Sequence, residues 1–437
     1  MVTYLTIIIV STVLAFISKK VEEKTKNKKI VILLDILVVL FPSIIAGIRY
    51  NVGTDYAGAY KPIFDELVNG HLEERRRNIE IGYILINKLV IFLHGNFNIV
   101  MFICSLITNS CIYAGLKHYK DKINVPLGFF FFMVIFYQKS FNLVRQLMAI
   151  AVVFYGFKYL DIKDDENMYE NEKYKKKYLE KGKDIEKYKP KYKHSKEYIK
   201  YFAINYAKYF ICVIIAVLFQ RTALVMLAVP FVREIYVNPK PVFQVLKVLS
   251  FVVLLAIILN FDTIGKLLSN IESLQYYALY FSKTKAPGLS IAYFIRILPG
   301  IVPFFFMIKK INHDKQMSLL FSMNIIGAVL LLLGYLTSTY GERLALFFTV
   351  FQIVLYPYYI RNFKDNKVLF VLSIIALVSV NLAIWFYDYI YKKRDETVPY
   401  KTIFSIEDNK EEKGRINSIS NNVIIEENKE NIINNEI

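Results

Sequence analysis

The sequence has only three cysteines and none of the short motifs that mark nucleotide or metal chemistry. Cys104, Cys111 and Cys212 all lie in apolar runs, as small core residues do, so neither a disulfide framework nor a pair of metal ligands is indicated. A Walker A loop, a dinucleotide-binding glycine fingerprint, a zinc-type histidine pair and a serine nucleophile elbow are all missing. We therefore expect chemistry that needs no metal and no other cofactor.

The N-terminus lacks the features of a cleaved signal peptide. Its first apolar run, 3–18, has neither a preceding basic segment nor an evident cleavage site, so we expect it to be retained as a helix.

Apolar sequence, in contrast, is abundant. Of the 437 residues, 55% are hydrophobic and 16% are aromatic, and they are gathered in runs, as in polytopic membrane proteins. The net charge of +18 does not indicate a nucleic-acid partner. The basic residues lie in connectors, in one insertion and in the tail, where they set topology and meet anionic lipid.

The apolar runs predict an all-α polytopic membrane protein with about 12–14 transmembrane helices, because each span needs roughly 20 apolar residues. Several runs are short, and some of the helices are expected to be re-entrant. The candidate spans are 3–18, 30–48, 80–95, 97–116, 125–139, 141–160, 199–219, 222–237, 241–261, 289–308, 316–336, 344–360 and 367–391.

Lysine-rich connectors place 19–29 and 117–124 in the cytoplasm, and so place the N-terminus outside. The number of crossings between Arg49 and 117–124 stays open. It must be odd, yet two apolar runs lie between them, so either one of these runs is re-entrant or 57–79 enters the membrane.

The predicted units are the membrane half 1–160 with outer loop 49–79, the charged cytoplasmic insertion 161–198, the membrane half 199–391 with outer loop 262–288, and a mostly disordered polar tail 392–437.

Four arginines at separate helix ends share the predicted outer side: Arg49, Arg145, Arg221 and Arg343. A fifth, Arg296, lies within an apolar segment, where a charge usually faces a cavity or a partner. Several cations around one cavity favour a strongly anionic guest, and a pyrophosphate matches the guanidinium fork. The alternative is that each arginine only anchors its helix at the lipid interface.

Acidic and amide side chains accompany these arginines. Asp55 is the predicted group that binds or deprotonates an acceptor hydroxyl, and a salt bridge to Arg49 is its alternative role. Glu80 and Glu342 are weaker candidates for the same function. Further residues are predicted to contact the substrate, with ordinary interhelical contacts as the alternative: Tyr56, Asn142, Gln146 and Gln220.

Three short sequence blocks in the N-terminal half contain these polar and charged residues: Arg49-Tyr50-x-Val52-Gly53-Thr54-Asp55-Tyr56, Glu80-x-Gly82-Tyr83 and Asn142-x-x-Arg145-Gln146. Together they resemble the EpsG family of exopolysaccharide polymerases, relatives of the Wzy-type O-antigen and capsule polymerases. The first block is the most specific. The resemblance continues through 220–230 and 341–348, and so covers most of the chain outside the insertion and the acidic tail.

The resemblance implies a GT-C-like transferase in the bacterial plasma (inner) membrane that joins undecaprenyl-pyrophosphate-linked oligosaccharides on the outer side. Its partners would be that lipid-linked substrate, the growing glycan, the bilayer and other assembly proteins such as a chain-length regulator, with no nucleic acid. Members often carry histidine where this chain has Gln220. Glutamine cannot act as a base near neutral pH, so the general base stays unassigned.

We therefore predict a polysaccharide polymerase for exopolysaccharide, capsule or O-antigen synthesis. Arg145, Arg221 and Arg343, together with Arg49 and Arg296, would neutralise the departing pyrophosphate while Asp55 engages the acceptor. Competing hypotheses are a flippase or transporter of the same lipid-linked glycan, an O-antigen-type ligase, and a structural partner in an assembly complex. A transporter would use the same electrostatics, although no clear internal repeat is visible.

Overall fold

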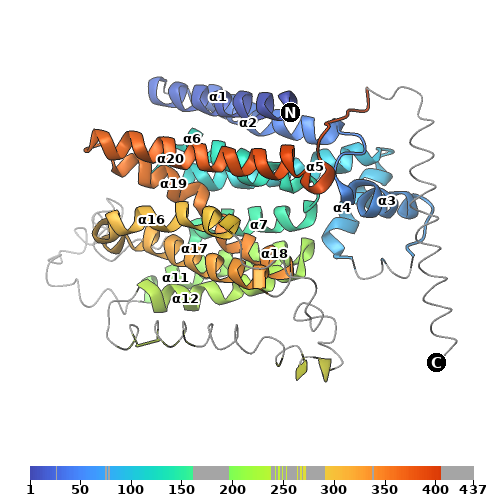
Figure 1. Ribbon diagram of the computed structural model, residues 1–437. Coiled ribbons are helices and arrows are strands. Elements are labelled where there is room, and N and C mark those ends of the chain that lie inside the picture. The colour runs from blue at the N-terminus through green and yellow to red at the C-terminus, as the bar shows by residue number, and fades with distance from the viewer. Residues whose placement is uncertain are drawn as a thin grey trace, which may run out of the picture.

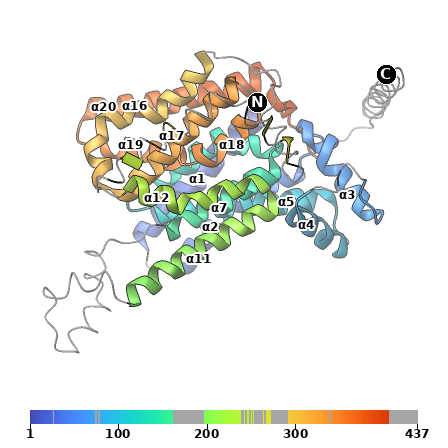
Figure 2. The ribbon, with the colours of Figure 1, turned by 90° about the horizontal axis from the view of Figure 1, so that it is seen from below.

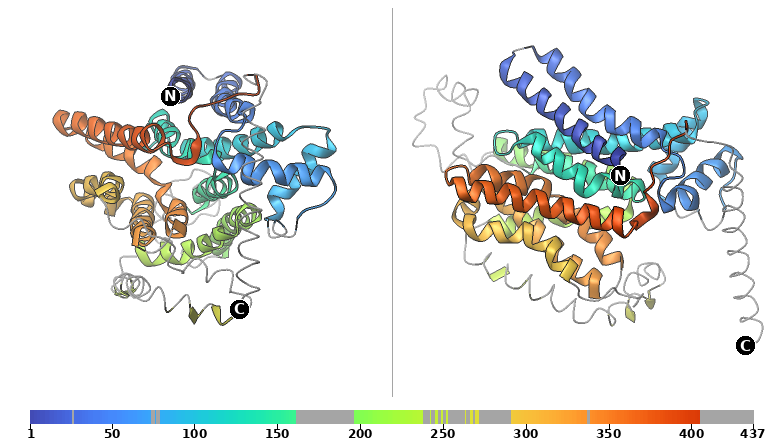
Figure 3. Two further views of the ribbon diagram at one scale, coloured as in Figure 1. Left: turned by 45° about the vertical axis from the view of Figure 1, so that its right-hand side comes forward. Right: turned by 45° about the horizontal axis from the view of Figure 1, so that its top comes forward.

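The computed structural model describes residues 1–25, 27–73, 76, 79–160, 196–237, 291–336 and 339–404, with isolated positions between 242 and 271. Within this part, the regular structure is helical apart from one isolated β-bridge. The longer helices lie side by side in a bundle (Figure 1), which Figure 3 shows nearly end-on. Most of the predicted insertion 161–198, most of the loop 262–288 and the tail beyond 404 lie outside the described residues.

The elements before the insertion are α1 (Val2–Lys24), α2 (Lys28–Ile48), η1 (Tyr56–Tyr60), α3 (Lys61–Val68), α4 (Ile81–Phe92), α5 (Phe97–His118), α6 (Val125–Phe132), η3 (Met133–Tyr137), η4 (Lys139–Phe141), α7 (Val144–Gly156) and η5 (Phe157–Tyr159). After it come α11 (Lys196–Phe219), η6 (Arg221–Ala228), α12 (Val229–Val237), α16 (Ile291–His313), α17 (Lys315–Leu336), α18 (Thr339–Thr349), α19 (Gln352–Asn362), α20 (Lys367–Trp385), η9 (Phe386–Tyr391) and η10 (Arg394–Glu396).

Six helices in the described part are long and apolar enough to cross a membrane, and α18 with α19 forms a seventh if that pair, bent by 44°, is one broken span. This confirms an all-α polytopic membrane protein. The expected 12–14 spans included runs that fold as shorter apolar helices, namely Ile81–Phe92, Val125–Tyr137 and Tyr293–Met307. Large apolar side chains remain exposed along α1, α2, α16 and α20, as lipid-facing surfaces require.

The two ends of the bundle differ in their charged residues. At the lysine end, where α1 and α5 finish, Lys117 bonds Asp35 at 2.5 Å and Lys122 bonds Asp314 at 2.7 Å. At the opposite end α2 and α11 finish and α7 begins, and α3 and α4 cover that end (Figures 1 and 2). We name this the arginine end after four residues: Arg49, Arg145, Arg221 and Arg343.

The position of α4 resolves the number of crossings in the N-terminal half. Glu80, directly before α4, pairs with Arg145 at the arginine end. Asn98, in the first turn of α5, donates to the carbonyls of Gly47 and Arg49 at 2.6 and 3.0 Å. Both ends of α4 therefore lie at the arginine end, so α5 alone crosses the bundle in this region.

Residues 392–404, which we expected to begin a disordered tail, pack along the arginine end as a terminal strap (Figure 3). The Tyr4 hydroxyl donates to the Thr397 carbonyl at 2.6 Å, and Gln138 Nε2 donates to the Thr397 hydroxyl at 2.5 Å. The backbone N–H of Tyr50 donates to the Lys401 carbonyl at 3.0 Å. The strap thus ties the last helix to α1 and to the end of α2.

Candidate functional site

An ion pair between Arg145 and Glu80 lies at the centre of the candidate site. Arg145 is the second residue of α7, and its Nη1 donates to Glu80 Oε2. The other carboxylate oxygen accepts the backbone N–H of Arg221 at 3.3 Å. The Glu80 side chain is 9% exposed and that of Arg145 is 26% exposed, so the pair is mostly shielded but still reaches the surface. One carboxylate therefore joins the start of α7 to the start of η6.

Gln146 brings the third predicted arginine to the same place. Its buried Nε2 donates to the Arg343 carbonyl at 2.5 Å. Two glycines let α17 and α18 approach closely there: a Cβ added to Gly341 would lie 2.6 Å from the Gly334 nitrogen. The Arg343 side chain is exposed, and the helix that carries it is held by the Gln146 hydrogen bond and by the close approach of Gly341 to Gly334.

Asn142 holds Asp55 near these arginines. The backbone N–H of Asp55 donates to Asn142 Oδ1 at 3.4 Å, and Asn142 Nδ2 donates to the Asp395 carbonyl at 3.1 Å. The Asn142 carbonyl accepts the Tyr60 hydroxyl at 2.8 Å. Gly53, at φ +97°, forms the turn before Asp55 and leaves space for the amide. Asn142 therefore positions the site rather than lining its surface.

The electrostatic neighbours of Asp55 support this grouping. Burial raises the pKa of the Asp55 carboxyl, the cations Arg343 and Arg145 oppose that shift, and Asp395 reinforces it. Arg221 and Arg343 are exposed, and neither guanidinium has an ion-pair partner within the described part of the chain. They are therefore available to an anionic ligand, whereas Arg145 already shares a carboxylate.

Arg49 and Tyr56 were predicted to bind substrate, but both are buried structural residues. Arg49 is 2% exposed, donates to the Phe141 carbonyl at 3.0 Å and lies 4.2 Å from the centroid of that ring. Tyr56 is also 2% exposed and packs edge-on against Phe97. The alternative salt bridge between Arg49 and Asp55 does not form. Arg49 instead stabilises the junction between α2 and η4.

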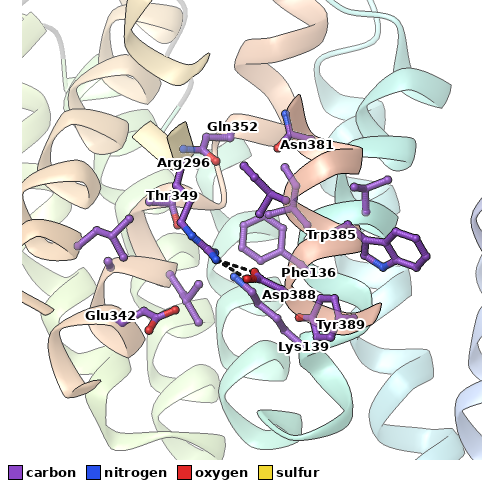
Figure 4. A pocket seen from close by; sticks show the side chains of 16 residues that line it. Phe136, Lys139, Arg296, Glu342, Thr349, Gln352, Asn381, Trp385, Asp388 and Tyr389 are labelled. Carbon is purple, nitrogen blue, oxygen red and sulfur yellow. Dashed lines mark hydrogen bonds and ion pairs between the residues drawn. The ribbon is translucent and has the colours of Figure 1, made fainter. Parts of the chain in front are cut away.

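Arg296 and Glu342 line a cavity separate from the three arginines, where Figure 4 shows them. Arg296 Nη2 donates to both oxygens of Asp388, at 2.5 and 2.7 Å, and Arg394 donates to Glu342 at 2.9 Å. Sequence reasoning missed Asp388 and the nearby Lys139. The available signal was a carboxylate inside the last apolar run, since charges at membrane depth usually have partners.

Gln220, where the resemblance described above leads us to expect a histidine, directly precedes η6. Its backbone N–H donates to the Ala216 carbonyl at 2.9 Å, and the half-buried side chain has no hydrogen-bond partner among the described residues. No cluster of three histidine, cysteine or acidic side chains able to hold a metal occurs in the described part. Metal independence remains a prediction.

Comparison of the sequence with models of known protein families identifies the family of this chain. A model of the EpsG family matches residues 32–169 and 195–402. The chain belongs to the EpsG family. The matched segments omit most of the charged insertion and reach into the terminal strap, so the strap is part of the family region. No curated protein and no solved structure matches the sequence.

Membership of the EpsG family suggests a role in polysaccharide polymerisation, and so a glycosyltransferase-like activity, in a membrane protein. The helices that are long and apolar enough to span a bilayer agree with that setting. The arginine end carries Arg145, Arg221, Arg343, Asp55 and Glu80.

Proposed function

We propose that this EpsG-family protein is a polysaccharide polymerase of the bacterial plasma membrane. It transfers a glycan from an undecaprenyl-pyrophosphate-linked oligosaccharide to an acceptor sugar hydroxyl on the outer face. One observation carries the proposal: α7, η6 and α18 bring Arg145, Arg221 and Arg343 to one end of the bundle, where Arg145 and Arg343 lie within electrostatic reach of Asp55. Guanidinium forks bind phosphate oxygens in pairs, so this grouping suits a diphosphate.

The reaction forms a bond between the acceptor oxygen and the anomeric carbon and breaks the bond from that carbon to a phosphate oxygen. The electron pair of the broken bond leaves with the lipid pyrophosphate. Arg145, Arg221 and Arg343 stabilise that growing negative charge, a contribution that is often the largest in enzyme catalysis.

Asp55 accepts the proton of the attacking hydroxyl. Burial raises the pKa of its carboxyl, which makes it a stronger base than an exposed aspartate. This assignment replaces the histidine that relatives often carry, because Gln220 cannot take a proton. Glu80, Gln146 and Asn142 act as positioning residues for the groups that meet the substrate.

Arg145→Lys tests the role of the fork, because lysine keeps the charge but loses paired hydrogen bonds. Purified protein in nanodiscs receives a lipid-pyrophosphate repeat unit, and glycan ladders and released lipid pyrophosphate are measured. We expect ladder formation to fall roughly 100-fold, as when one transition-state donor is removed elsewhere. Arg361→Lys, at an exposed position of the lysine end, is the matched control and should keep full activity.

Three outcomes would contradict the proposal. Ladder formation at the wild-type rate would remove Arg145 from the mechanism. Movement of the substrate across liposomes without longer products would show a flippase instead. Transfer of a finished glycan to a different acceptor, again without ladders, would show a ligase.

A further inference from the structure

A cavity of about 70 Å³ lies inside the bundle, apart from the three arginines. The side chains around it come from η3, η4, α16, α17, α18, α19, α20 and η9. This is room for one group the size of a phosphate, since a single water needs only roughly 10–15 Å³ on this measure. Four charged residues line it (Figure 4): Lys139, Arg296, Glu342 and Asp388.

The four lining charges cancel in number, but Arg394 adds a further cation, because it pairs with Glu342 from outside the cavity lining. Arg296 is paired with Asp388, and Glu342 is paired with Arg394. Lys139 is left over: its amine has no hydrogen bond and no ion pair with any residue that the structure describes. Lys139 is half-buried, and an ammonium that is partly removed from solvent without a direct partner is unfavourable, so the surroundings favour a negative group beside it.

A second donor in the cavity wall is also unused. The hydroxyl of Tyr389 is buried and has no hydrogen-bond partner in the described part of the chain. An amine and a phenol along one wall are both donors, and phosphate oxygens are strong acceptors. The Lys139 side chain extends toward the Arg296–Asp388 pair (Figure 4), so an anion beside Lys139 would also lie near that guanidinium.

The helices that carry Arg296 and Asp388 also face outward with apolar residues. Phe294 is 50% exposed and Phe386 is 49% exposed, each two residues from the charged residue of its own helix. Residues two apart point to nearly opposite sides of a helix, so these two helices border the charged cavity on one side and present apolar surface to lipid on the other. Free phosphate has the same recognition chemistry.

We propose that the Lys139 cavity binds one phosphate group, carried by a membrane lipid or free, with Lys139 and Tyr389 as donors. The site does not require the transferase reaction proposed above, and it does not include the three arginines. Its failure would leave the proposed function intact, and loss of polymerase activity would leave this site intact.

The test measures binding to purified full-length protein that has been stripped of lipid in detergent. Phosphatidylglycerol and inorganic phosphate are titrated separately and followed by native mass spectrometry, with a phosphate-free galactolipid as background. We expect Lys139→Met to weaken phosphate binding roughly tenfold or more, the loss of one charge-assisted hydrogen bond. Lys401→Met removes an exposed lysine of the strap and should bind as the wild type does.

The outcomes separate the two sources. Loss of phosphatidylglycerol binding alone identifies a lipid headgroup, loss of inorganic phosphate alone identifies a free anion, and loss of both shows that the phosphate group itself is recognised. Equal binding by wild type and Lys139→Met overturns the proposal.

If Lys139→Met does not fold, hydrogen exchange of the wild-type protein tests the site instead. Hydrogen exchange should slow in the segments 134–141 and 385–391 when either phosphate probe is added, but not with the galactolipid. Unchanged exchange with both phosphate probes would overturn the site.

Discussion

At the scale of single residues, arginines that look alike in the sequence have three different environments. Arg49 is enclosed by protein, Arg145 shares a carboxylate, and Arg343 is exposed without an ion pair among the described residues. The difference depends on partners distant in the chain: Glu80 is 65 positions from Arg145. The four-arginine grouping could be predicted from helix ends, whereas the burial of Arg49 could not.

The loss of activity at low pH, the acid limb of the pH–rate profile, should be caused by protonation of Asp55. Only the deprotonated carboxylate accepts a proton, so activity is lost as the pH falls through the raised pKa of Asp55. Arg343→Gln removes the cation that most strongly opposes this rise, so the pKa rises further and the acid limb moves to higher pH. The check is a pH–rate profile of ladder formation, with Arg361→Gln as control.

Asp55→Asn should lower the rate roughly 100-fold or more, the usual contribution of a general base. Its residual activity should no longer show the same acid limb. An acid limb that stays in place in both Asp55→Asn and Arg343→Gln would assign the titration to another group.

At the scale of elements, the close backbone contact between α17 and α18 fixes the position and direction of the charged side chains on α18. The first turn of α18 lies against α17 where Gly334 would place a Cβ 2.5 Å from the Glu342 nitrogen. That turn directs Glu342 to the inner cavity, while the next residue, Arg343, is exposed. The sequence shows both glycines, but their mutual contact follows only from helix packing.

Gly341→Ala should destabilise the protein by about 1–3 kcal/mol, the usual effect of overpacking, because backbone atoms of α17 cannot move aside as a side chain can. Thermal unfolding in detergent measures this. Gly58→Ala is the matched control, since nothing lies within 4 Å of its added Cβ. Equal melting temperatures for the two variants would show that α17 and α18 can separate without loss.

At the scale of the whole molecule, the basic residues and the helix directions agree. The arginine end contains the N-terminus and the strap, and the lysine end contains the connectors that were predicted to be cytoplasmic. α4 removes the one inconsistency, because it returns to the end from which it starts. The described helices therefore alternate in direction as the predicted orientation requires, and which end faces the cytoplasm stays a prediction.

Cysteine labelling tests this orientation in a background where the three native cysteines are replaced by alanine. Lys401→Cys, in the strap, should react with a membrane-impermeant maleimide on intact cells. Lys364→Cys, exposed between α19 and α20, should react only after permeabilisation. The opposite pattern would invert the topology and place the three arginines in the cytoplasm.

By itself the sequence determined the all-α membrane class, the helix directions and the grouping of Arg145, Arg221 and Arg343 at one end. These follow from apolar runs and from basic connectors, which are local properties of the chain. The tertiary structure alone decided that Arg49 is internal, that α4 does not cross, and that Lys139 meets Arg296 and Asp388 around a cavity. Burial and ion pairing depend on which distant segments pack together, and no local pattern encodes that.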